Sequence, residues 1–256
     1  MRDNTVLRKL REGKPTVGSW LTLDSSLVAG IMARVGFDWL MIDTEHGTMD
    51  YSDMLSAIQA ILPTTTTPLV RVAWNDGALI KRALDAGAMG VLIPMVMNGD
   101  EARFAVEAVR FPPQGRRSYG GLAVQTFYGE DYFPRANEEI LLSVQIEHIE
   151  AVQRAEEICE VEGIDLVFIG PNDLASSLGL LGTPFKENTL WQDAVKRILK
   201  VGREKGKPMG IHAVSTEEVE RYIEQGFLFV ALSTDAQILR QACSNLLKSL
   251  KGKNGS

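Results

Sequence analysis

Short apolar runs alternate with amphipathic segments along almost the whole of this chain. The runs predict strands at 17–23, 39–42, 68–72, 90–94, 141–146, 166–169, 208–211 and 227–232. The segments between them have helical periodicity, at 25–35, 51–62, 76–86, 99–109, 150–160, a short helix after 171, a long helix ending near 205, 215–225 and 235–250. A repeated strand–helix unit predicts a parallel sheet, and eight units predict a closed barrel.

The predicted fold class is therefore α/β, a (β/α)8 TIM barrel that forms a single domain over residues 1–256. The competing fold, a doubly wound open sheet, usually has a glycine-rich phosphate turn after its first strand. The stretch TLDSSLVAG at 22–30 has no such turn. Residues 111–135 break the repeat and are expected to form an active-site loop, since long loops in compact domains are usually functional. Residues 251–256 are expected to be a frayed tail.

Composition excludes several classes of partner. The chain is 45% hydrophobic with a net charge of -6, so nothing predicts a basic face for nucleic acid or an anionic membrane. No apolar run approaches the ~20 residues of a membrane span. The two cysteines form no CxxC pair, which fits a reducing cytoplasm.

Charged side chains follow several of the predicted strands at the point where each strand ends. Asp43, Glu45 and His46 follow the second strand, Arg71 ends the third, and Glu147 follows the fifth. In a (β/α)8 barrel the carboxyl ends of the strands form one mouth, where the chemistry takes place. Independent helix caps explain a residue such as Asp173 but explain Arg71 and Glu147 poorly.

Two carboxylates at this mouth form a candidate metal site. Glu147 and Asp173 end consecutive strands, and oxygen ligands suit a hard divalent ion such as Mg²⁺ or Mn²⁺. The alternative is that Asp173 caps a helix while Glu147 pairs with a lysine. Arg71 is a candidate for holding an anionic oxygen, or an ion-pair partner of Asp43, or both.

Proton transfer and covalent catalysis have different candidates. His46 can titrate near neutral pH and is the candidate general base. No lysine lies at the carboxyl end of a predicted strand, so a metal-dependent route is favoured over a Schiff base.

The motifs DWLMIDTEHG, PLVRVAWND, IKRALDAGAMGVLIPMV, FPPQGRRSYG, VQIEHIEA and DLVFIGPNDLASSLG together resemble the HpcH/HpaI aldolase family. These are class II, metal-dependent pyruvate aldolases of the 4-hydroxy-2-oxoheptanedioate and 2-keto-3-deoxy-rhamnonate type. The resemblance implies a barrel of the phosphoenolpyruvate/pyruvate type, a homohexamer, and a divalent cofactor that is Mg²⁺ or Mn²⁺, with Co²⁺ and Zn²⁺ as alternatives.

The resemblance also implies a role for each matching residue. Glu147 and Asp173 would bind the metal, with His46 as general base and Arg71 stabilising the enolate. Asp85 would raise the basicity of the histidine, either in its own subunit or in a neighbour. The expected substrate-binding residues are Arg71, Gln145, Asn172 (through its backbone) and Asp173, while Asp43 and Glu45 would orient their neighbours.

The predicted reaction is reversible cleavage of a 4-hydroxy-2-oxo acid to pyruvate and an aldehyde. Two alternative functions would use the same pyruvate enolate: an oxaloacetate decarboxylase and a macrophomate synthase-like enzyme. A CoA-dependent citrate lyase-like enzyme and a non-catalytic barrel are further rivals. The stretch GGLAVQTFYGEDYF at 120–133 departs from the heptanedioate enzymes, and Tyr128 or Tyr132 is expected to cover the mouth and affect the choice of aldehyde.

Overall fold

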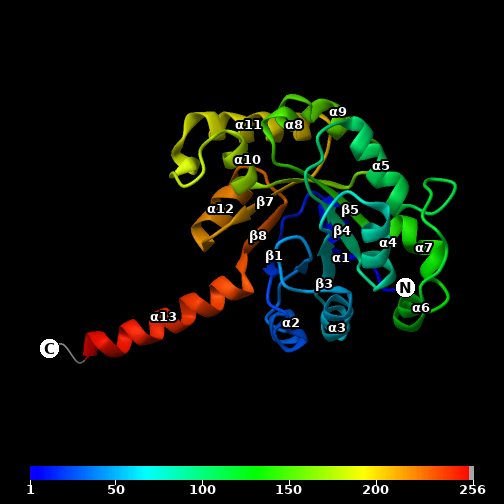
Figure 1. Cartoon of the computed structure of the whole chain (residues 1–256), viewed down its shortest axis with the longest axis horizontal. Helices are drawn as coiled ribbons and strands as arrows, with labels where there is room; N and C mark the ends of the chain where they lie inside the picture. Colours follow the sequence, from blue (N-terminus) through cyan, green and yellow to red (C-terminus); the bar gives the residue numbers. More distant parts are fainter. Residues whose placement is uncertain (254–256) are drawn as a thin grey trace.

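In a computed structural model, which describes residues 1–253, parallel strands close into a barrel in which each pairs with the next in the chain and β8 pairs with β1. Figure 1 shows the barrel with its surrounding helices. The predicted (β/α)8 fold is confirmed. The strands are β1 Thr16–Leu21, β2 Trp39–Asp43, β3 Thr67–Arg71, β4 Gly90–Ile93, β5 Leu141–Ile146, β6 Leu166–Ile169, β7 Met209–Ala213 and β8 Phe229–Thr234.

The predicted helices are present in the predicted order, with differences at their ends, and α1, α6 and α7 occur in addition. They are α1 Thr5–Arg11, α2 Ser26–Ala33, α3 Tyr51–Ile61, α4 Gly77–Asp85, α5 Gly99–Val109, α6 Leu122–Tyr128, α7 Tyr132–Glu139, α8 Ile149–Gln153, α9 Ala155–Glu160, α10 Pro171–Ser177, the 3₁₀ turn η1 Phe185–Glu187, α11 Thr189–Glu204, α12 Thr216–Glu224 and α13 Asp235–Lys253. The predicted helix 150–160 is two helices, because the chain turns out of helical geometry at Arg154.

Helix α1 was not predicted, and it lies at the amino-terminal end of the barrel. The Asn4 side chain caps it by accepting a hydrogen bond from the Leu7 backbone N–H at 3.1 Å. Its buried residues Val6, Leu7 and Leu10 join the apolar cluster that fills the barrel interior. The helix therefore closes the end opposite to the mouth.

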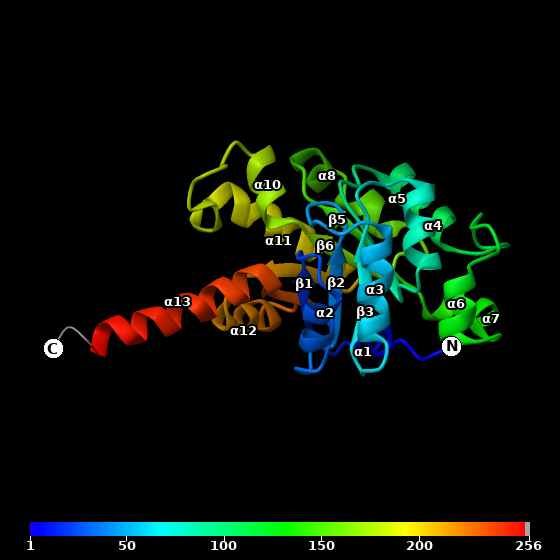
Figure 2. The ribbon, with the colours of Figure 1, turned by 60° about the horizontal axis from the view of Figure 1, so that its bottom comes forward.

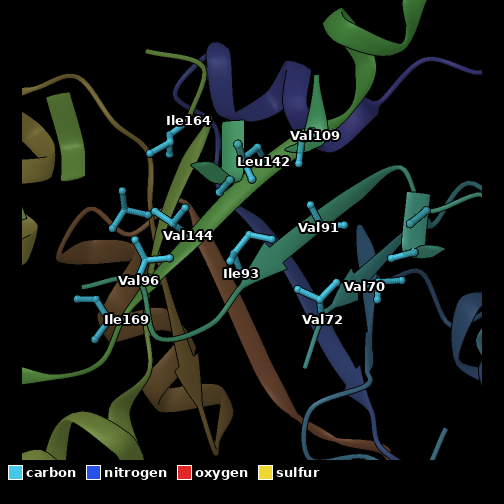
Figure 3. Packing of buried hydrophobic residues seen from close by; sticks show 14 of the residues in the cluster. Val70, Val72, Val91, Ile93, Val96, Val109, Leu142, Val144, Ile164 and Ile169 are labelled. Carbon is cyan, nitrogen blue, oxygen red and sulfur yellow. The ribbon is translucent and has the colours of Figure 1, made fainter. Parts of the chain in front are cut away.

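Two apolar layers hold the barrel together. Inside, Trp39 stacks on Phe229 with ring centroids 3.9 Å apart. A Cβ at Gly18 would lie 2.0 Å from the Trp39 ring, so only glycine fits on the neighbouring strand. Outside, branched side chains of the strands pack against the helices, as Figure 3 shows for Val70, Val91, Leu142, Val144 and other members of that layer.

Residues 111–135 are not at the mouth of this barrel. They lie between the carboxyl end of α5 and the start of β5, which places them at the amino-terminal end of the strands, and they contain α6 and the first half of α7. Tyr128 and Tyr132 are buried, and the Tyr128 hydroxyl donates to the Gly87 carbonyl. The expectation that either tyrosine covers the mouth is wrong within this chain.

The last helix, α13, projects away from the barrel in both views of the ribbon (Figures 1 and 2). It includes residues 251–253 of the expected frayed tail, and residues 254–256 lie outside the described part. Large apolar side chains on this helix are more than half exposed: Leu239, Leu246, Leu247 and Leu250. Within residues 1–253, no helix is long and apolar enough to span a bilayer.

Candidate active site

Strands β2 and β3 place a carboxylate and a guanidinium side by side at the mouth. Asp43 is paired with Arg71 in the strand register. The Arg71 Nε and Nη2 atoms donate to the two carboxylate oxygens of Asp43 at 3.0 and 2.7 Å. The guanidinium also lies over the Trp20 ring, 4.5 Å from its centroid. This two-point contact holds the guanidinium in one orientation.

The turn after β2 adds two more polar side chains. Glu45 approaches the Arg71 Nη1 atom at 2.9 Å, so two acids hold one arginine. Burial raises the pKa of Glu45, which opposes the effect of the nearby Arg71. His46 is 64% exposed, and its Nε2 atom lies 3.8 Å from the Glu45 carboxylate. The histidine is therefore free to meet a substrate.

Glu147 lies deeper, at the end of β5. One of its oxygens accepts from the Met95 backbone N–H at 2.8 Å and the other from the Gln145 amide at 2.5 Å. A Cβ at Gly170 would lie 2.1 Å from the Glu147 carboxylate. Glycine at the end of β6 is thus required for Glu147 to take this position.

The carboxyl group of Glu147 is in an unusual electrostatic environment. Burial raises its pKa to about 8, and the nearby carboxylates of Asp173 and Glu45 act in the same direction. Asp173 and Asn172 lie in the first turn of α10, on its exposed side. Helix α10 starts at the end of β6, so both residues border the mouth.

One cavity joins these groups, with a volume of about 170 Å³. Asp43, Arg71, His46, Gln145, Asn172 and Asp173 are among the predicted residues that line it. Glu147 lies just beneath, in contact with Gln145. The predicted convergence of these strand ends on one site is therefore present in the structure.

Asp85 lies elsewhere. It is the last residue of α4, which runs from the mouth to the opposite end of the barrel, where β4 begins. There its carboxylate accepts from Arg117 at 2.7 Å, and Arg117 also donates to the Tyr132 hydroxyl. Asp85 cannot act on His46 of its own chain.

Some lining residues were not predicted or were set aside. Trp20, Thr234 and Gln237 line the cavity, and His212 does so from the end of β7. The strand order would have placed Trp20 and Thr234 at the mouth, but neither residue type signals a reaction by itself. Burial lowers the pKa of His212 to about 4, so its ring is neutral at pH 7.

Comparison with known proteins shows the family of this chain. Residues 16–242 match the family model described as HpcH/HpaI aldolase/citrate lyase. A 4-hydroxy-2-oxo-heptane-1,7-dioate aldolase of Escherichia coli is 41% identical over 247 residues, covering 95% of this chain and 94% of that protein. This chain belongs to the HpcH/HpaI family, and the expected enzyme class, a carbon–carbon lyase, is confirmed by its aldolase relatives.

Solved structures give the same result. An HpcH/HpaI aldolase/citrate lyase family protein of Burkholderia cenocepacia superposes with a TM-score of 0.92 at 35% identity, covering 97% of this chain and 99% of that one. Macrophomate synthase superposes with a TM-score of 0.87 at 25% identity, covering 98% and 89% of the two chains.

Proposed function

We propose that this enzyme reversibly cleaves a 4-hydroxy-2-oxo acid to pyruvate and an aldehyde through the enolate of pyruvate, with a divalent metal ion. The observation that carries the proposal is the Arg71 guanidinium, held by two acids, facing the same 170 Å³ cavity as Gln145 and Asp173 above the buried Glu147. The aldolase of Escherichia coli supports the reaction type.

The chemistry of the donor set fits a divalent cation. Glu147 is a buried carboxyl whose neighbours Asp173 and Glu45 are also acids. The Gln145 Oε1 atom is buried and has no hydrogen-bond partner among the described residues. Residues 1–253 contain no group of three or more histidine, cysteine or acidic residues placed to hold a metal. Glu147 and Asp173 would hold the ion, leaving positions for substrate.

When bound, the metal supplies Lewis-acid polarisation of the 2-oxo group. Mg²⁺ or Mn²⁺ suits the two carboxylates best, with Co²⁺ and Zn²⁺ as alternatives. The chain's own contribution to charge stabilisation is Arg71. Its orientation is fixed before substrate arrives, so it can donate to the enolate oxygen without reorganisation. Asp43 and Glu45 keep that orientation.

His46 is the proposed general base. It takes the proton of the 4-hydroxyl group, and the C3–C4 bond then breaks to give the aldehyde and the enolate. In the synthetic direction the same imidazole returns the proton to the new hydroxyl. Gln145 and the backbone N–H of Asn172 would hold the pyruvate half, beside Asp173.

The proposed histidine partner, Asp85, requires a second subunit. It lies at the far end of its own barrel, so a neighbouring chain would have to present it to His46. Exposed apolar surface supports a homo-oligomer, of which a hexamer is the proposed form. On α2 and just beyond it, Leu27, Ile31 and Val35 repeat at helical spacing and are 67–79% exposed, in addition to the leucines of α13.

A second reaction shares this site. Decarboxylation of oxaloacetate gives the same enolate and requires no hydroxyl proton to be removed. We therefore propose it as a side activity or the alternative main activity of this site. A cytoplasmic location remains the prediction made from composition.

Metal removal tests the proposal directly. Protein treated with a chelator should lose pyruvate release from a 4-hydroxy-2-oxo acid and regain it with Mg²⁺ or Mn²⁺. Burial raises the pKa of Glu147 to about 8, so its carboxyl group is protonated at lower pH and a metal ion must displace that proton. Metal affinity should therefore rise as pH increases toward 8 and level off above it. Activity that survives complete metal removal would refute the metal-dependent mechanism.

A further inference from the structure

A second cavity lies beside the mouth, lined by the segments that follow β3, β4 and β5 and by the first turns of α5. Its volume is about 490 Å³, and it shares no lining residue with the active-site cavity. Sites for small organic ligands commonly measure roughly 300–1,000 Å³. The proposed reaction uses none of the side chains around it. We call it the outer cavity, and its lining is Trp74, Asn75, Met95, Met97, Glu101, Phe104 and His148.

The outer cavity contains a carboxylate without a basic side chain to neutralise it. Glu101 lies in the first turn of α5. Among the described residues, the lining of this cavity includes neither lysine nor arginine. Arg103, on the same helix, pairs with Asp100 instead. A negatively charged ligand would therefore meet Glu101 without a counterion, whereas a positively charged ligand would supply one.

The hydrogen bonds of Glu101 hold its carboxylate in place. One oxygen accepts from the Met97 backbone N–H at 2.8 Å, and the other accepts from the Asn98 side-chain amide at 3.1 Å. The Asn98 side-chain oxygen in turn accepts from the Glu101 backbone N–H at 2.9 Å. Each carboxylate oxygen keeps a further lone pair, so the group can still accept from a ligand.

A second acceptor lies next to this acid. The Asn75 side chain donates from Nδ2 to the Glu101 backbone carbonyl at 3.0 Å, which fixes the amide beside α5. Its Oδ1 atom is buried and has no hydrogen-bond partner within residues 1–253. A buried acceptor without a partner is costly. A ligand with several N–H donors would supply the partner that this oxygen lacks.

Aromatic and thioether side chains form the rest of the wall. Trp74 is 56% exposed and Phe104 is 45% exposed, so both rings are open to a ligand. A cation is attracted to the face of such rings, and most strongly to tryptophan. Met95 and Met97 add polarisable, adaptable apolar surface for a short carbon chain.

We propose that the outer cavity binds the ammonium group of a small organic amine. Glu101 is its counterion, Trp74 and Phe104 are its aromatic walls, and the carbon chain lies against the methionines. The inference goes beyond the proposed aldolase function and does not depend on it, because the cavity is a different one and requires no metal. An alcohol of the same length would lack the charge that Glu101 and the rings attract.

The test compares the butylammonium ion with 1-butanol, which has the same carbon chain and no charge. Saturation-transfer NMR titrations on the full-length, metal-free protein give the two dissociation constants. We expect butylammonium to bind at least about tenfold more tightly, since a hydrogen bond to a charged group contributes more than a neutral one. Equal affinities for the two compounds would overturn the proposal.

Variants show where the amine binds. Glu101→Gln keeps an acceptor for the Met97 N–H but removes the charge, so it should weaken butylammonium binding about tenfold and leave butanol unchanged. Phe104→Leu, at a position exposed enough to be replaced without loss of the fold, should weaken it about two- to fivefold. Glu107→Gln is the matched control, because Glu107 lies on the same helix outside the cavity and pairs with Arg116.

The acidic mouth is the competing location for a cation. Asp173→Asn removes a charge there and should leave butylammonium binding unchanged. Circular dichroism confirms that each variant is folded. Binding that weakens in Asp173→Asn and not in Glu101→Gln would place the amine at the mouth and overturn the proposal. Unchanged binding in folded Glu101→Gln and Phe104→Leu proteins would overturn it as well, and neither result would affect the proposed aldolase function.

Discussion

Two arginines at opposite ends of this barrel have almost the same surroundings. Arg71 is bound by Asp43 and lies 4.5 Å from the centroid of a tryptophan ring. Arg117 is bound by Asp85 and lies 4.5 Å from the centroid of the Phe111 ring. Each is an arginine–aspartate pair against an aromatic face.

What separates them is the space in front of the guanidinium. Arg71 faces the cavity, and strand ends surround it with further polar groups. The Arg117 side chain is 0% exposed, and its Nε and Nη1 atoms have no partner within residues 1–253. A buried arginine–aspartate pair therefore does not by itself mark the active site of its own barrel. Such a pair indicates a candidate active site where it lines a cavity at which several strands end.

Replacing Arg71 with alanine should have the largest effect on turnover. The enolate oxygen loses a donor whose orientation was fixed in advance, which typically costs about 10²–10³ in rate. Both aldol cleavage and oxaloacetate decarboxylation should fall, because both form the enolate. Steady-state kinetics with the two substrates, on protein shown to be folded by circular dichroism, make the test. A folded variant that still decarboxylates oxaloacetate at the wild-type rate would contradict the assignment.

His46→Ala should separate the two reactions. Losing a general base typically costs about 10²–10⁴ in rate, so aldol cleavage should fall by at least 10². Decarboxylation should fall less than tenfold, because no hydroxyl proton has to be removed. The ratio of the two kcat/KM values is the measurement. Equal losses in both reactions would rule out the proposed role.

The same variant tests whether Asp85 acts across a subunit boundary. His46→Ala and Asp85→Asn proteins, each weak alone, should regain turnover when mixed, unfolded and refolded together. In the mixture some sites combine an intact His46 with an intact Asp85 from a neighbour. Refolding each variant separately is the control. No gain on mixing would mean that Asp85 does not serve the partner's histidine.

Gly170→Ala should act at the mouth without removing any functional side chain. The new Cβ would lie 2.1 Å from the Glu147 carboxylate and 2.5 Å from the Gln145 amide, so both must shift. Disturbing the groups that orient a ligand typically costs 10–100-fold in metal affinity. Titration with Mn²⁺ measures it, and Ser176→Ala, on the exposed side of α10, is the control. Unchanged affinity would argue against Glu147 as a ligand.

The mouth could be predicted from sequence because each strand end is a local pattern. An apolar run followed by Arg71 or Glu147 carries its own signal, and the parallel barrel then brings the strand ends together. The geometry that makes Gly170 necessary could not be predicted, because it depends on the separation of β5 and β6. The role of His212 was also ambiguous. A histidine after an apolar run can line a cavity or pack in the core, and no local sequence pattern distinguishes the two.

The opposite end was predicted poorly for a different reason. Aromatic residues and glycines in 111–135 resemble an active-site loop, but the segment joins a helix to the strand that follows it. A connection from a helix to the next strand lies at the amino-terminal end of a parallel barrel. The helices α6 and α7 were missed because their stability comes from packing of Tyr128 and Tyr132, which no local periodicity reports.

Arg117→Met should have the smallest effect on metal affinity at the mouth and the clearest effect on stability. Removing one partner of a buried ion pair typically costs about 3–5 kcal/mol, and the partial exposure of Asp85 places this loss at about 3 kcal/mol. Metal affinity should stay within twofold of wild type, because Arg117 lies at the other end of the barrel. Urea unfolding and Mn²⁺ titration measure the two quantities, with the exposed Arg116→Met as control. Adding Asp85→Asn to Arg117→Met should recover part of the lost stability, since no buried charge is then left without a partner. A loss of metal affinity as large as that of Gly170→Ala would mean that the two ends of the barrel are coupled, and the distinction between the two arginines would fail.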